Sequence, residues 1–229
     1  MDSVELQRQI DSAMMRARAM GVETENIFTK VWERIGFNFR SMVASQGIML
    51  VTSSLREIYE NVRNLDAAMT ELKKVTDGTA ATYERFLEDA TERSQRLGAS
   101  LVDVVSASAD FARLGYSISD SAMLSDAALV YLNVGDDVDS IEDSTKALIS
   151  TMQGFGIEAS KVMSIVDKFN EVSNKYASSA GDIGEITLRS AAAMSAAGSS
   201  LEETIALGVA ANTVQQDAST VGTAMKTMS

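Results

Sequence analysis

The residues best able to do chemistry in this sequence are carboxylates, and they are densest between Gly135 and Asp143. Carboxylate oxygens are preferred ligands of Ca²⁺, so this acidic cluster could form a calcium site. The ligand order and central glycine of an EF-hand loop are absent, however. Acidic side chains also gather at helix N-termini, where the helix dipole favours negative charge. We therefore interpret the cluster as the start of a helix, and predict no metal site and no cofactor. Its acidic residues are Asp136, Asp137, Asp139, Glu142 and Asp143.

Two side chains that dominate enzyme active sites are missing, because the 229 residues include no histidine and no cysteine. Ser-His-Asp and Cys-His arrangements, histidine-based metal sites and disulfides are therefore impossible within this chain. The glycine-rich stretches 154–156 and 181–184 lack the preceding strand and the following Gly-Lys-Ser/Thr of a phosphate-binding loop. The sequence thus predicts a protein that is not an enzyme.

Charge is distributed unevenly along the chain. Residues 76–229 carry 10 basic and 22 acidic side chains, whereas residues 1–75 are neutral overall. An acidic surface repels phosphate backbones, so we predict no specific nucleic-acid binding. Asp2 and Glu5 lie where a signal peptide would have basic residues, so we expect no signal peptide.

The elements that carry these residues are predicted to be helices throughout. The sequence contains no proline, and a recurring turn both ends and starts helices. In this turn, a glycine able to adopt the left-handed conformation stops one helix. A serine two residues later, followed after three more by an acid, starts the next helix as a capping box. The turns begin at Gly98-Ala-Ser100, Gly115-Tyr-Ser117, Gly156-Ile-Glu158 and Gly198-Ser-Ser200, and the Glu158 copy has the weaker cap.

These turns repeat at nearly equal intervals, from Gly115 to Gly156 and from Gly156 to Gly198. Apolar residues recur with them, for example Leu124, Ile165 and Leu207. A period of about 40 residues is typical of stacked helical hairpins. The alternative is coincidence, because Gly-x-Ser is common in serine-rich helical proteins. Helices are predicted over 79–97, 101–113, 118–133, 140–153, 159–176, 183–197, 201–213 and 218–228.

The sequence divides into residues 1–78, with long amphipathic helices, and the hairpin-repeat region 79–229. Residues 41–55 carry no charge, which favours a helix buried against partners, with membrane contact as the alternative. A near-heptad apolar stripe follows and predicts an association seam of the coiled-coil type, although an ordinary amphipathic helix would show the same spacing. The seam residues are Leu55, Tyr59, Val62, Leu65, Met69 and Leu72.

Several stretches stand out together by their order and spacing: Leu65–Val75, Leu97–Ser100, Phe111–Gly115, Met152–Gly156, Ala193–Gly198, Val209–Gln216 and Val221–Thr227. Together they resemble the core region of phage tail tape measure proteins, over about residues 55–229. The resemblance implies a structural protein that lies inside the tail tube of the virion, sets tail length during assembly and is released when the genome is ejected. It also implies contacts with tail tube and tail-tip or baseplate proteins.

Because tail tubes are rotationally symmetric, we expect several copies to associate, as a parallel trimer through the seam. A transient contact with the host membrane is a further expectation. Members of this family are usually much longer, and the chain ends inside a predicted helix, so we expect a fragment of a longer protein. Two other functions stay open: an α-helical repeat scaffold that binds another protein, and a membrane-active helical protein.

Overall fold

The structure, a computed structural model, describes residues 49–228, with side chains from residue 60 onward. This part of the chain contains nine α-helices and one 3₁₀-helix, and it has no strand. The predicted all-α fold is therefore confirmed. The helices are α3 (Met49–Val75), α4 (Ala80–Leu97), α5 (Leu101–Ala112), α6 (Ile118–Val134), α7 (Ile141–Phe155), η1 (Ala159–Lys161), α8 (Val162–Ser173), α9 (Ala180–Ala196), α10 (Leu201–Gln215) and α11 (Ala218–Met228).

Contacts divide the chain into two compact units, Met1–Val62 and Arg63–Ser229. The predicted helices before residue 49 lie outside the described residues. The division of the sequence at residues 78 and 79 stays a prediction, because only part of the first segment is described.

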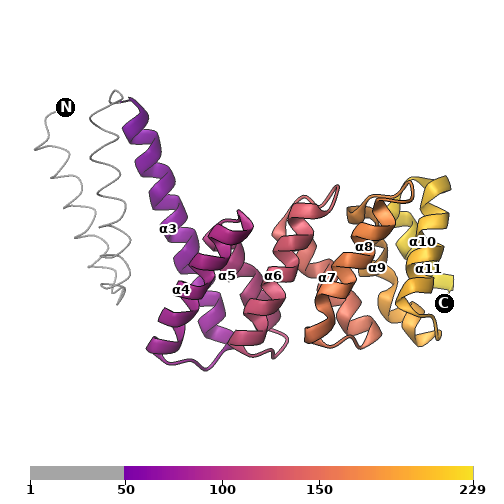
Figure 1. Cartoon of the computed structure of the whole chain (residues 1–229), viewed down its shortest axis with the longest axis horizontal. Coiled ribbons are helices and arrows are strands. Elements are labelled where there is room, and N and C mark those ends of the chain that lie inside the picture. Colours follow the sequence, from indigo (N-terminus) through magenta and orange to yellow (C-terminus); the bar gives the residue numbers. More distant parts are fainter. Residues whose placement is uncertain (1–48, 229) are drawn as a thin grey trace, which may run out of the picture. The chain divides into compact units, whose positions relative to one another are not determined.

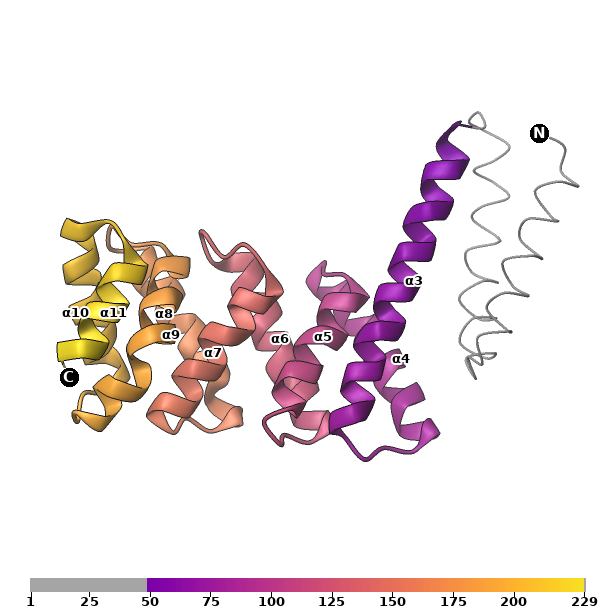
Figure 2. The same ribbon diagram turned by 180° about the vertical axis from the view of Figure 1, so that it is seen from behind.

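Within the second unit, helices α4 to α11 follow one another along a row, and short turns reverse the chain between them (Figures 1 and 2). Helix α5 packs against α6, and α9 packs against α7 and α11. This arrangement is the predicted stack of helical hairpins. Each helix is amphipathic or largely apolar, so the stack buries apolar faces that a single hairpin would leave in water.

Most helix bounds lie within two residues of those predicted, and two differ for identifiable reasons. The helix expected from residue 159 begins as the 3₁₀-helix Ala159–Lys161, because Glu158 makes no side-chain cap. The helix expected from residue 183 begins earlier, at Ala180, because Ser179 caps it. In both places the capping residue decides where regular helix starts.

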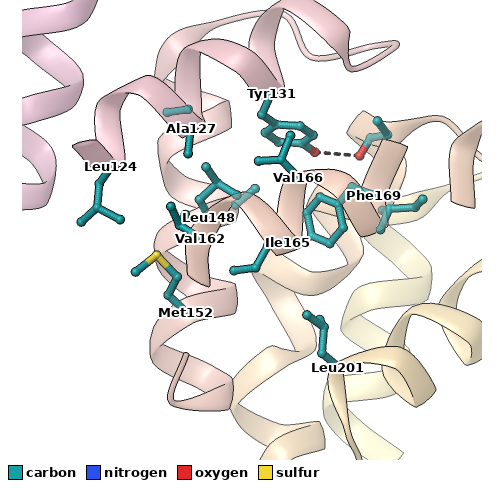
Figure 3. Packing of buried hydrophobic residues seen from close by; sticks show 14 of the residues in the cluster. Leu124, Ala127, Tyr131, Leu148, Met152, Val162, Ile165, Val166, Phe169 and Leu201 are labelled. Carbon is teal, nitrogen blue, oxygen red and sulfur yellow. Dashed lines mark hydrogen bonds between the residues drawn. The ribbon is translucent and has the colours of Figure 1, made fainter. Parts of the chain in front are cut away.

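The largest core cluster of the described residues draws side chains from every helix from α5 to α10, around two aromatic rings (Figure 3). The rings of Tyr131 and Phe169 meet edge to face, with centroids 5.5 Å apart and planes at 63°. Edge-to-face pairs are favourable beyond the area they bury. A second cluster joins the end of α3 to α4, α5 and α6, and a smaller one joins α9 to α11.

Candidate functional site

The four predicted stop glycines all have backbone conformations that side-chain-bearing residues rarely adopt. Their φ angles are 65° at Gly98, 89° at Gly115, 63° at Gly156 and 91° at Gly198. Gly156 directly follows α7, and its N–H donates to the carbonyl of Met152. The four glycines therefore lie where helices end and the chain turns back.

The predicted serine caps lie at helix starts. The hydroxyls of Ser100, Ser117 and Ser200 each accept a hydrogen bond from the N–H three residues later, over 3.0 to 3.1 Å. At Ser200 the carboxylate of Glu203 also accepts from the serine N–H, which completes a capping box. The carboxylate of Glu203 accepts hydrogen bonds from both the backbone N–H and the hydroxyl of Ser200. Both lower the pKa of Glu203, and the bond from the backbone N–H has the larger effect.

Glycines inside the helices let neighbouring helices come together closely. A Cβ atom added at Gly154 of α7 would lie 2.7 Å from the Cβ of Ala191 in α9. One added at Gly222 of α11 would lie 3.1 Å from the Cα of Ile186 in α9. One added at Gly184 would collide with the hydroxyl of Tyr131. Ala191 begins an alanine-rich segment, 191–197, and its small side chain allows this close approach to Gly154.

Hydrogen bonds between helices add direction to these apolar contacts. The hydroxyl of Tyr131 in α6 donates to the carbonyl of Ala180 in α9 over 2.7 Å, drawn as a dashed line in Figure 3. Burial raises the pKa of Tyr131, so the hydroxyl keeps its proton and remains a donor. From α7, Ser144 donates to the carbonyl of Ala128 over 2.6 Å. Satisfied buried polar groups of this kind favour one relative placement of helices.

Asn212 is a buried polar residue that the sequence pattern did not single out. Its side-chain amide donates to the carboxylate of Asp182 over 2.9 Å and to the hydroxyl of Ser178 over 3.2 Å. It thereby ties the last turn of α10 to the start of α9. A single asparagine in an apolar helix was the only available signal, and periodicity alone does not say what such a residue contacts.

The acidic cluster between Gly135 and Asp143 surrounds the start of α7, as predicted for acids at a helix N-terminus. Asp143 and the cap Ser140 are hydrogen-bonded, and Glu142 pairs with Lys146 over 2.7 Å. A cavity of about 140 Å³ lies beside the cluster, lined by Asp137, Asp139 and Asp143 together with residues of α6, α7 and α9. Among residues 60–228, no group of three His, Cys, Asp or Glu side chains is arranged to hold a metal ion.

The structure covers the second half of the predicted association seam within the chain. Met69 and Leu72 are buried, and Leu65 is half-buried, in the cluster formed with α4 and α5 of the same chain. Periodicity identified the apolar stripe correctly, but the chain covers it with its own next hairpin. Val62 is half-buried, and the side chains of Leu55 and Tyr59 are not described.

Polar contacts hold the same end of α3 in place. The guanidinium of Arg113, just after α5, lies 3.0 Å from the carboxylate of Glu71. Hydrogen bonds from Lys74 and then from Arg113 lower the pKa of Glu71. The pair is largely exposed, so it orients α3 more than it stabilises the fold.

The uncharged run 41–55 is described only from residue 49, where it forms the first part of α3. None of the described helices is both long and apolar enough to cross a membrane.

The described helices thus form a structural stack, whose distinctive residues stop, cap and join helices. Residues 87–229 match the family described as phage-related minor tail protein, over more than half of the chain. The chain belongs to this family, which includes tape measure proteins. It is therefore a structural component of the phage tail. No solved structure matches the chain.

Proposed function

We propose that the protein acts as a tape measure: it lies in the lumen of the tail tube, sets tail length during assembly and leaves ahead of the genome. The match of residues 87–229 to the minor tail protein family carries this proposal, because that family includes tape measure proteins. The remainder of the proposal rests on physical fit.

A length ruler needs a structure whose extent grows in proportion to the number of residues. The hairpin stack meets this requirement, because each period of about 40 residues adds a further helical hairpin. Residues 76–229 carry a net charge of −12, so they repel DNA that follows them through the tube.

Partners follow from the same role. We propose contacts with tail tube and tail-tip proteins, and self-association as a trimer. Because Met69 and Leu72 are buried within the chain, association through the whole predicted seam requires α3 to separate from α4 and α5. Sedimentation equilibrium tests the trimer: a monomer at micromolar concentrations, unchanged by Val62→Asp, would contradict it.

Deleting one repeat tests the ruler itself. Residues 157–198 span one full period, from just after Gly156 to Gly198, and can be removed in frame from the gene in its phage. Tails measured by electron microscopy should shorten. Continuous helix predicts a loss of roughly 60 Å, at about 1.5 Å per residue, whereas stacked hairpins predict a loss of about 10 Å.

The control is the point variant Ser200→Ala, which keeps the residue count and should keep the tail length. Virions that contain the shortened protein but have tails of unchanged length would refute the tape measure role, while leaving membership of the family intact.

A further inference from the structure

Helices α6, α8 and α10 occupy equivalent places in the repeat, yet one of them is exposed where the other two are buried. Their apolar positions are related by the same intervals that separate Gly115, Gly156 and Gly198. The equivalent sets are Leu124, Ala128 and Tyr131 in α6; Ile165, Phe169 and Val172 in α8; and Leu207, Ala211 and Val214 in α10. We call the last set the α10 stripe.

The first two sets are covered by the stack. All three residues of the α6 set are buried, as are Ile165 and Phe169, and Val172 is partly buried against the same core. In the α10 stripe, by contrast, the exposed fraction is 55% for Leu207 and 87% for Val214, and Ala211 is exposed as well.

The covering element is known for α8. Leu201, Ile205 and Val209 of α10 lie in one cluster with Ile165 and Phe169 of α8, and Figure 3 shows Leu201 on their side of the core. Helix α10 therefore uses one face to cover the preceding repeat. The α10 stripe lies on a different face and continues the same row of interfaces beyond it.

The chemistry of this face is that of an interface rather than of a solvated surface. Residues 204–216 include no charged side chain, in a region whose net charge is −12. On α4, by comparison, exposed positions carry Glu84, Arg85, Glu88 and Asp89. An uncharged face that exposes leucine and valine together is typical of an interaction surface.

We propose that the α10 stripe is the docking surface for one further helical hairpin of the same repeat, supplied in cis by the same polypeptide. Its first helix continues α11, and its second helix covers α10 as α10 covers α8. One stripe of three side chains is small beside the area of about 800 Å² per partner that a stable complex between separate chains usually buries. Covalent linkage raises the effective concentration of the hairpin, so a small interface is enough.

An extended chain tests this proposal. A copy of residues 188–215 is placed directly after Ser229. It continues the repeat in register, because its first residue then lies 42 residues after Leu188, the same spacing that separates Gly156 from Gly198. The copy supplies the end of an α9-like helix followed by an α10-like helix. The matched control carries Leu201→Asp, Ile205→Asp and Val209→Asp in the copy only. Those are the three side chains that cover α8 in the parent chain.

Because the chain has no cysteine, a single Leu207→Cys substitution reports how exposed the stripe is. The intact extension should slow thiol modification at least about tenfold, because reaction then requires local opening. The control extension should leave the rate unchanged. Met123→Cys, at an exposed position of α6 outside the stripe, should react equally fast in all three proteins. Val214→Cys repeats the measurement if Leu207→Cys disturbs folding.

Equal modification rates with the intact and the control extension overturn the proposal, whether or not the copy folds. Protection in the unextended chain that grows with protein concentration also overturns it, because a second copy would then be the occupant of the stripe.

Discussion

Helices α6 and α8 are joined differently from helices α9 and α11. The first pair meets through large side chains, with Tyr131 packed against Phe169 inside the main core. The second pair shares the apolar side chains of a smaller cluster, but at Gly222 the α11 backbone itself lies against Ile186 of α9. The difference teaches that one stack contains two kinds of interface. The first should be sensitive to the removal of atoms and the second to their addition.

The largest expected effect is at the side-chain interface. Phe169→Ala should lower the free energy of unfolding by about 3–5 kcal/mol, because it leaves a cavity in the closed core. Leu207→Ala, at an exposed position of the α10 stripe, should change it by less than about 0.5 kcal/mol. Urea denaturation measures both variants. Equal losses would show that the α8 and α10 positions do not differ as described.

At the backbone interface, enlargement should do the damage. Gly222→Leu should cost about 1–3 kcal/mol, because its side chain has no space against Ile186. Ala224→Leu is the matched control two residues away, at an exposed position of α11, and should be nearly neutral. Thermal unfolding followed by circular dichroism compares the two. A stable Gly222→Leu protein would mean that α9 and α11 are not in close contact.

Helices α7 and α10 end in the same left-handed conformation but on different residues, which gives a pair of substitutions with opposite signs. Gly156 after α7 and Gln216 after α10 both have left-handed conformations, with φ of 63° and 51°. Gly156→Val should cost about 1–3 kcal/mol through backbone strain alone, since open space surrounds its missing Cβ. Gln216→Gly should add up to about 1 kcal/mol, because it removes the same kind of strain. Unchanged melting temperatures for both would contradict the assigned turn conformations.

The smallest effect concerns the caps of α8 and α10. The pKa of Glu203 lies below its ordinary value of 4.5, so its cap stabilises the folded state above that pH. This contribution is lost as pH falls through the lowered pKa, when the carboxylate becomes protonated. The melting temperatures of the parent and Glu203→Gln should therefore differ near neutral pH and converge in acid. Glu158→Gln, at the start of η1 where no side-chain cap forms, should show no such convergence.

The turns could be predicted from the sequence because helix termination is local. Gly98, Gly115, Gly156 and Gly198 needed only the conformational freedom of glycine, and Ser100, Ser117 and Ser200 needed only an N–H three residues away. The left-handed Gln216 escaped prediction, because glutamine carries no signal for that conformation.

What covers an apolar face was decided only by the tertiary structure. Periodicity identified the stripe through Leu65, Met69 and Leu72, but it could not distinguish another copy from the next hairpin of the same chain, and the hairpin covers it. The position of Leu207 looked the same as those of Leu124 and Ile165 in sequence, yet it alone is exposed. A sequence pattern records the polarity of each face, because polarity is a property of the residues on it. Burial also depends on what lies opposite, and that is settled only when distant segments pack together.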